Sequence, residues 1–223
     1  FAVEAGDASA LRVLAAAREA RPAARQPFVI GPHVNVYNRA ALVEHAVLGA
    51  GAWVAPLELG LDAVAAINPP HDPVAGPAGP VASEVFVFGR LPLAFSARCF
   101  TARHHRLSKD ECDFRCRDDA DGLLVRSSEG QPFLVLNGIQ TQSAAVQALI
   151  GHGAALREAG VSRVRLSPCA SGFAQVLRLF DAVYNQALPI AQAREALAAL
   201  PLPGALVDGF ARGRPGLQAL EAA

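Results

Sequence analysis

Short runs of apolar, β-favouring residues alternate with longer stretches whose apolar positions recur at helical spacing. The run at 1–5 precedes 8–20, where Leu11, Leu14 and Ala15 share one helical face. The run that begins at Phe28 precedes the helical stretch 39–51, in which Gly49 is a natural stop. The same strand-then-helix pattern returns at 52–67. Such βα units favour a parallel sheet.

The second half of the chain gives a similar but less regular pattern. Residues 84–95 predict a strand, and 121–140 predict two strands around a Ser-Ser-Glu-Gly turn. We expect a helix over 143–160, a strand over 162–168 and a helix over 172–186. The stretch 68–80, rich in Pro and Gly, predicts a surface loop without regular structure.

The predicted fold class is α/β, a TIM-barrel-like (β/α)8 barrel with about six of its eight strands present. We expect one domain over 1–223, with a cysteine-bearing insertion at 96–117 and a helical tail from about 187 to 223. The chain opens directly in a strand-like run and contains no methionine. These two features predict a fragment that lacks the first two βα units.

Composition narrows the class of protein. Of the 223 residues 52% are hydrophobic and 18% charged, enough for a sizeable core. The chain has twenty basic and twenty acidic residues, so no overall field favours nucleic acid or an anionic membrane as a partner. No apolar run reaches the roughly 20 residues that span a bilayer, and the start of the given sequence lacks the charged, apolar and cleavage-site pattern of a signal peptide. We therefore expect a cytoplasmic protein.

Polar residues follow the predicted strands, where barrel enzymes carry their catalytic groups. They are His33, Asn35, Tyr37, Glu58, Arg90, Ser96, Arg98, Cys99, Asn137, Gln140, Gln142, Ser167 and Cys169. For any one of them, satisfying the backbone of a loop is an equally good explanation. As candidates for one substrate cavity we select His33, Asn35, Arg90, Asn137 and Gln140, with Phe95, Phe100 and Ile139 as possible apolar walls.

Three of the four cysteines, Cys99, Cys112 and Cys116, lie within eighteen residues. Their segment is charged and lacks an apolar period, so core packing does not explain them. A zinc site needs close couples of ligands, which Cys112 and Cys116 supply, and Cys99 with His104 or Cys169 could complete a tetrahedron. An iron–sulfur cluster tolerates looser spacing and is anionic, which suits the six Arg and Lys residues between 98 and 117. The residues alone leave both open. Cys169 by itself is best explained as a small packed residue.

The stretches at 88–116 and 136–144 closely resemble a ubiquinone-biosynthesis branch of the collagenase-like peptidase family. Shorter matches at 1–7, 31–38, 53–59, 164–168 and 208–216 follow in the family's order. This resemblance implies a barrel of which the chain begins at the third strand. It also implies a role in oxygen-independent hydroxylation of the ubiquinone ring, on a precursor with an isoprenoid tail.

The same resemblance implies a heterodimer with a related protein, UbiU, and a four-iron four-sulfur (4Fe-4S) cluster in each subunit. Cys99, Cys112 and Cys116 match three of the four cluster ligands, and the fourth lies upstream of this sequence. Cys169 matches no family ligand. Two alternatives remain. One is a peptidase, although the chain has neither a His-Glu-x-x-His nor a Gly-x-Ser-x-Gly motif. The other is a non-catalytic scaffold or electron-transfer partner.

Overall fold

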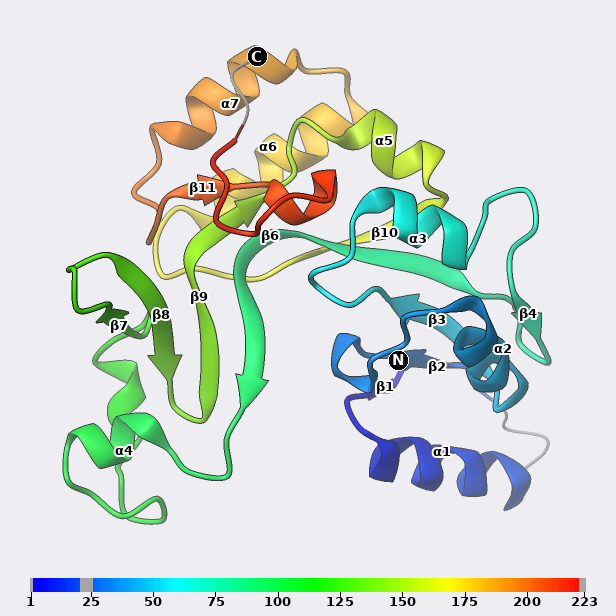
Figure 1. Ribbon diagram of the computed structural model, residues 1–223, viewed down its shortest axis with the longest axis horizontal. Coiled ribbons are helices and arrows are strands. Elements are labelled where there is room, and N and C mark those ends of the chain that lie inside the picture. Colours follow the sequence, from blue (N-terminus) through cyan, green and yellow to red (C-terminus); the bar gives the residue numbers. More distant parts are fainter. Residues whose placement is uncertain (1, 21–25, 221–223) are drawn as a thin grey trace. The chain divides into compact units, whose positions relative to one another are not determined.

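The computed structural model describes residues 2–20 and 26–220. The chain divides into two compact units. Unit 1 comprises Phe1–Phe86, His152–Arg165 and Phe210–Pro215, and unit 2 comprises Val87–Gly151, Leu166–Gly209 and Gly216–Ala223. Figure 1 labels the elements along the chain.

Unit 1 is built on parallel strands in the order β1-β2-β3-β6. The strands are β1 (Glu4–Ala5), β2 (Phe28–Ile30), β3 (Ala50–Val54) and the first part of β6 (Ala82–Phe95). The helices between them are α1 (Ala8–Ala20), α2 (Arg39–Val47) and α3 (Leu61–Ile67), followed later by α5 (Gly153–Glu158). The βα repeat predicted for the first third of the chain is confirmed here.

Local sequence explains where these helices begin and end. Asn38 caps α2 by accepting the Ala41 N–H at 2.8 Å. The helix stops at Leu48, and Gly49 follows with φ 103°, a conformation that only glycine adopts readily. The apolar faces of the helices and strands bury Ile30, Leu42 and Val54. Gly49 is therefore the helix stop that the sequence predicts.

The loop 68–80 is organised by one buried side chain. Asn68 donates from Nδ2 to the Val81 carbonyl and to Ser83 Oγ, and its Oδ1 accepts the Val74 N–H, each at 2.8 Å. The loop also contains a short antiparallel pair, β4 (Ala75–Gly76) and β5 (Gly79–Pro80). The expectation of no regular structure is wrong for these four residues, because a tight turn at 77–78, followed by Gly79 with φ 91°, lets the chain pair with itself.

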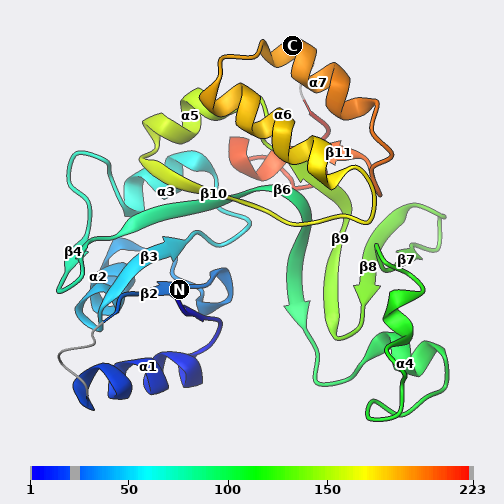
Figure 2. The ribbon, with the colours of Figure 1, turned by 180° about the vertical axis from the view of Figure 1, so that it is seen from behind.

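Unit 2 is an antiparallel ribbon in the order β6-β9-β8-β7 (Figure 2). Its strands are the second part of β6, β7 (Leu123–Arg126), β8 (Pro132–Asn137) and β9 (Gln140–Ala148). Strand β11 (Leu206–Val207) pairs with β9 in parallel, and β10 (Val161–Leu166), which belongs to unit 1 apart from Leu166, pairs with β6. The two strands predicted within 121–140 are confirmed as β7 and β8. The prediction of a parallel sheet holds for unit 1 and is wrong for this ribbon.

The helix expected over 143–160 is wrong in its first half. Residues Ser143–Ala148 continue β9, and only Gly153–Glu158 is helical. Ser143–Ala148 is buried throughout and pairs on one side with β6 and on the other with β11. Small alanines fit between two strands, and this non-local pairing outweighs their local preference for helix.

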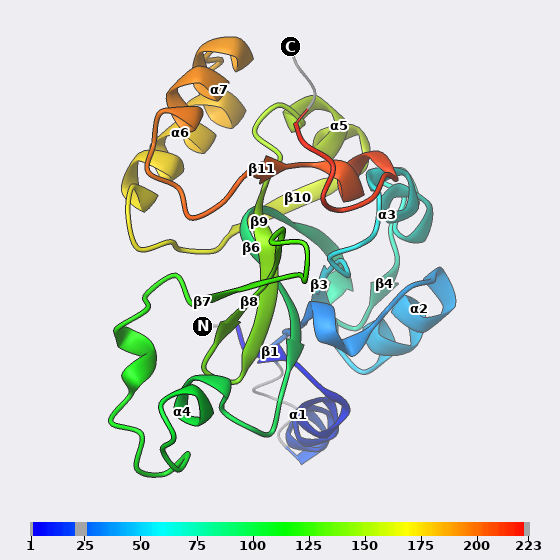
Figure 3. The same cartoon turned by 60° about the vertical axis from the view of Figure 1, so that its left-hand side comes forward.

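Two helices in unit 2, α6 (Phe173–Asn185) and α7 (Ile190–Ala198), pack side by side (Figure 3). Phe180 of α6 meets Phe88 at 5.8 Å between ring centroids and Tyr184 at 5.5 Å. The Tyr184 hydroxyl donates to the Leu149 carbonyl at 2.7 Å. The segment expected as a helical tail holds α7, then β11 and a 3-10 turn at Gly209–Arg212. The fold is thus mixed α/β, and its identity as a (β/α)8 barrel stays a prediction.

Candidate functional site

The three clustered cysteines lie in unit 2, in the segment between β6 and β7. Cys99 precedes the short helix α4 (Phe100–His104), and its Sγ accepts the Ala102 N–H at 3.4 Å. Cys112 lies in the following loop, and Cys116 lies in a 3-10 turn at Arg115–Arg117 that packs against α4. All three thiols are free and half-buried. None is therefore committed to a disulfide or to the core.

The surroundings of these cysteines are strongly basic. Residues 98–117 contain six Arg or Lys and three Asp or Glu residues. Local contacts hold some of the cations: Arg115 pairs with Asp118 at 3.0 Å, Lys109 reaches the Ala97 carbonyl at 3.4 Å, and Arg117 lies 5.7 Å from the Phe114 ring centroid. The excess of positive charge would favour an anionic cofactor.

The backbone between Cys112 and Cys116 has an uncommon conformation. Asp113 has φ 48° and Phe114 has φ 52° and ψ 44°, both in the left-handed region. The loop is closed by its own backbone: the Arg115 N–H donates to Cys112 O at 3.0 Å and the Arg117 N–H donates to Phe114 O at 2.9 Å. The turn therefore holds Cys112 and Cys116 close together along the chain.

A metal site can be tested against this geometry. The donor set suits a soft metal or an iron–sulfur cluster, because it consists of unbridged thiols in a cationic loop. Within residues 2–20 and 26–220, no three His, Cys, Asp or Glu side chains already converge as ligands of a metal ion would. Holding a cluster would require the segment from Cys99 to Cys116 to close around it and a further ligand to join.

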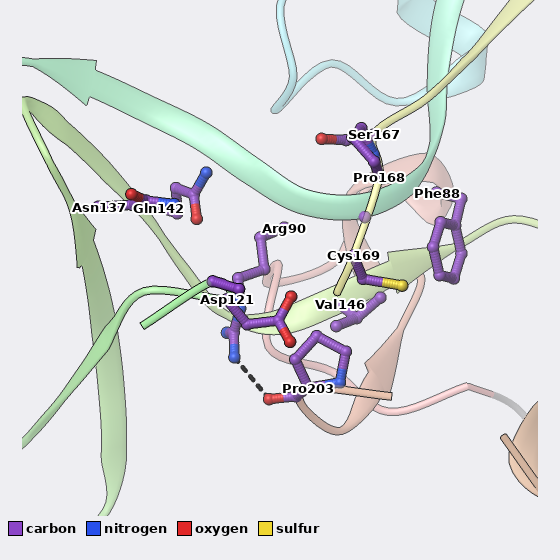
Figure 4. Close-up of a pocket in the computed structure, with 12 residues that line it drawn as sticks. Phe88, Arg90, Asp121, Asn137, Gln142, Val146, Ser167, Pro168, Cys169 and Pro203 are labelled. Carbon is purple, nitrogen blue, oxygen red and sulfur yellow. Dashed lines mark hydrogen bonds between the residues drawn. The ribbon is translucent and has the colours of Figure 1, made fainter. Parts of the chain in front are cut away.

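A separate pocket in unit 2 gathers several of the polar residues that follow strands (Figure 4). Its volume is about 40 Å³. It is lined by Phe88, Gly89, Arg90, Ala120, Asp121, Asn137, Gln142, Val146, Ser167, Pro168, Cys169 and Pro203. The pocket is thus formed by β6, β8, β9, the end of the cysteine-bearing segment and the loop after β10.

Arg90 is fixed at this pocket by main-chain carbonyls. Its Nη1 donates to Ser143 O at 2.9 Å and to Ala144 O, and its Nη2 donates to Pro203 O at 2.5 Å. Burial lowers the pKa of the guanidinium, while the nearby Asp121 carboxylate opposes this shift. The side chain stays cationic at any physiological pH, so it is a fixed positive charge in the wall.

Asp121 and Cys169 also line the pocket, and Asp121 lies beside Arg90 (Figure 4). Asp121 Oδ1 accepts the Ala170 N–H at 2.8 Å, which ties the end of the cysteine-bearing segment to the loop after β10. The Cys169 thiol donates to the Ser171 carbonyl at 3.1 Å. Burial, and after it the Asp121 charge, raise the pKa of this thiol. Cys169 is therefore a protonated thiol at neutral pH and a poor nucleophile.

The five residues selected for a substrate cavity fall in different places. Arg90 and Asn137 line the unit 2 pocket. Gln140 is not among the lining residues; its Oε1 accepts a hydrogen bond from Gln142 Nε2, and Gln142 does line the pocket. His33 lies half-buried in a 3-10 turn at Pro32–Val34 of unit 1, and Asn35 ends that turn with φ 63°. Of the suggested apolar walls, Phe95 and Ile139 are 57% and 39% exposed.

Unit 1 has a second polar pair after its strands. The Tyr37 hydroxyl, after β2, donates to Glu58 Oε1, after β3. Burial, the hydrogen bond to Glu58 and the charge of Glu58 together raise the pKa of Tyr37 to about 12. Tyr37 therefore stays protonated near neutral pH and donates its hydroxyl proton to Glu58.

Comparison with known proteins places the chain in a family. The family model for peptidase family U32 matches residues 4–198, most of the chain. The chain belongs to peptidase family U32. The U32 match includes all four cysteines and every pocket residue except Pro203. No solved structure was found to match the chain.

The pocket of this U32 chain includes residues that the sequence did not single out. Asp121 follows three other acidic or small residues in the run 118–121 and looks like part of a solvated turn. Pro203 lies in the segment expected as a helical tail. The hydrogen bond from Arg90 to the Pro203 carbonyl and the hydrogen bond from the Ala170 N–H to Asp121 are what place these two residues at the pocket.

Among the described helices, none is both long and apolar enough to cross a membrane.

Proposed function

We propose that this U32 chain resembles UbiV and is the iron–sulfur subunit of an oxygen-independent system that hydroxylates the ubiquinone ring. It would act as a heterodimer with a UbiU-like protein, on a ubiquinone precursor with an isoprenoid tail. The observation that carries the proposal is the placement of three free cysteines on one basic segment of a U32 family member.

Cys99, Cys112 and Cys116 would hold the cluster together with a fourth ligand. When bound, a four-iron four-sulfur cluster supplies one-electron transfer. The chain's own contribution would be electrostatic: six basic side chains offset the negative charge of the thiolates and sulfides.

The pocket does not suit the aromatic ring itself. A cavity of about 150 Å³ is known to hold benzene, whereas this pocket measures about 40 Å³. We therefore do not assign the ring to the pocket, although Arg90 and Asn137 line it. Nor does the pocket favour a cysteine peptidase, since burial and Asp121 raise the pKa of its only thiol, that of Cys169.

The proposal is tested in anaerobically grown bacteria that lack their own UbiV. The full-length gene is expressed with and without a UbiU-like partner, and ubiquinone is extracted and measured. We expect recovery that depends on the partner and is lost in Cys99→Ser, Cys112→Ser and Cys116→Ser. The matched variant Cys169→Ser should recover ubiquinone normally, because its thiol packs in a different place.

Two outcomes would contradict this proposal. Normal recovery by all three cysteine variants would show that the chain is a scaffold and that the cluster has no role. No recovery by the wild-type chain, together with anaerobic cleavage of gelatin by the purified protein, would favour a peptidase.

A further inference from the structure

The tip of the β8–β9 hairpin carries the chain's single Asn-Gly sequence. Of the five asparagines in the chain, only Asn137 is followed by a glycine. Asn137 ends β8 and pairs with Gln140 at the start of β9, so Gly138 and Ile139 form a two-residue turn. Gly138 has φ 61°, and glycine adopts such a positive φ in a hairpin turn without strain.

An Asn-Gly sequence is open to spontaneous deamidation, because glycine has no side chain to hinder attack by its own backbone nitrogen. A bond forms between the Gly138 nitrogen and Asn137 Cγ, and the bond from Cγ to Nδ2 breaks. The proton of the Gly138 N–H passes to the leaving nitrogen, which departs as ammonia. Water then opens the cyclic succinimide at either carbonyl and leaves aspartate or isoaspartate. The reaction needs water and no oxidant or cofactor.

The fold restrains both reacting atoms. The Gly138 N–H donates to Thr101 Oγ1 at 3.0 Å, and Thr101 is only 2% exposed, so a buried hydroxyl holds the proton that the attacking nitrogen must lose. Asn137 is held in the extended backbone of β8 by its pairing with Gln140. Ring closure requires this backbone to rotate until Cγ reaches the next nitrogen. The reaction can therefore proceed only when the tip leaves Thr101 and the last pair of the hairpin opens.

The contact with Thr101 belongs to a clasp around the hairpin tip. The Phe100 N–H donates to Gly138 O and the Ser96 N–H donates to Ile139 O, each at 2.8 Å. Both donors lie in the segment that carries Cys99, where α4 begins, against the tip of the hairpin (Figure 3). Whatever frees this segment from the hairpin also frees the attacking nitrogen.

We propose that Asn137 is a deamidation site, kept closed in the folded chain by the hydrogen bond between Gly138 and Thr101. Either product adds a negative charge to the pocket that Asn137 lines. Isoaspartate also lengthens the main chain at the tip by one methylene, so the pairing with Gln140 and the clasp cannot re-form as before. The modification thus makes an opening of the clasp permanent. The inference does not depend on the iron–sulfur proposal.

The test follows Asn137 in the full-length protein by peptide mass spectrometry during incubation at neutral pH. Deamidation replaces NH2 by OH and raises the mass of the peptide, and an isoaspartyl methyltransferase labels the isoaspartate product. Conversion should be slow in the folded protein and at least about tenfold faster in the same protein unfolded in guanidinium chloride, since only the open form reacts.

Thr101→Val is the deciding variant. It keeps the branched shape of the side chain but removes the hydroxyl, so the Gly138 N–H loses its acceptor. The population of the open form, and with it the rate of conversion, should rise about tenfold. Thr101→Ser keeps the hydroxyl and should convert at nearly the wild-type rate.

Two further measurements separate a local opening from a general loss of stability. Asn68→Ala removes three buried hydrogen bonds from unit 1 and none from the hairpin, so conversion of Asn137 should stay within about twofold of wild type. Native-state hydrogen exchange needs no variant: the Gly138 amide of the wild-type protein should be protected at least about tenfold relative to the unfolded chain.

Several results would overturn the inference. Equal conversion in folded and unfolded wild-type protein, or an unprotected Gly138 amide, would show that the clasp does not shield the site. The wild-type rate in Thr101→Val, or an equal rise in Asn68→Ala, would show that Thr101 does not control it. No conversion of Asn137 in the unfolded chain would show that it is not a deamidation site.

Discussion

Replacing Asn68 by Ala should destabilise unit 1 more than almost any other single loss of a polar group. The side chain is 3% exposed and makes three hydrogen bonds of 2.8 Å, to Val81 O, Ser83 Oγ and Val74 N. Its φ of −135° is open to alanine, so the substitution adds no backbone strain. Only the hydrogen bonds and the filled volume are lost.

The expected magnitude follows from those three bonds. A typical buried hydrogen bond contributes about 1 kcal/mol, and a partner left without one costs about 1–3 kcal/mol. We expect a decrease in the free energy of unfolding of about 3–5 kcal/mol for Asn68→Ala. The control is Asp72→Ala in the same loop of unit 1, where the exposed carboxylate pairs with Arg39 at 2.9 Å. That variant should lose about 0.5 kcal/mol or less.

The assay is urea unfolding followed by tryptophan fluorescence. The chain has a single tryptophan, Trp53, which is fully buried in β3 of unit 1. Its emission therefore reports on this unit. The two variants should shift the midpoint with little change in slope. A loss below 1 kcal/mol for Asn68→Ala, or equal losses in both variants, would refute the idea that Asn68 organises the loop 68–80.

Two further predictions concern titration. In a Tyr184→Phe background, the phenolate absorbance of Tyr37 should appear with a midpoint near the pKa of about 12, and Glu58→Gln should move that pKa down toward 10.0 without reaching it, because burial remains. Because the pKa of Tyr37 is higher in the folded than in the unfolded chain, the protonated Tyr37 hydroxyl stabilises the fold fully below pH 10, and this stabilisation is lost as the pH rises toward 12. A phenolate midpoint at pH 10 would contradict the contact between Tyr37 and Glu58. For Cys169 the raised pKa predicts slow modification by iodoacetamide at neutral pH in the folded chain, and a loss of stability above pH 9 that Cys169→Ser abolishes. Equal rates in folded and urea-unfolded protein would contradict the burial of the thiol.

The sequence predicts the elements of unit 1 well because each is fixed by nearby residues. The apolar stripe of α2, its cap Asn38 and its stop Gly49 lie within fourteen positions. Strand β9 is different. Its alanines prefer helix locally, and only pairing with β6, about sixty residues earlier, and with β11, about sixty residues later, makes 143–148 a strand.

The pocket likewise has residues that a local sequence pattern predicts and residues that only distant contacts bring to it. Arg90 and Asn137 follow apolar runs, which makes them visible as residues at strand ends. Asp121 lies in an acidic turn, and its partner Ala170 is 49 residues away. No local pattern indicates that contact, because it arises from how the segment after Cys116 meets the loop after β10.

The most direct test of the central claim is the iron and acid-labile sulfide content of the full-length protein purified without oxygen. The account predicts about four irons and four sulfides per chain, with an electron paramagnetic resonance signal after reduction. Cys99→Ser, Cys112→Ser and Cys116→Ser should each lose most of both, while Cys169→Ser keeps them. Stoichiometric zinc without sulfide, or full iron and sulfide in any of the three variants, would contradict the claim.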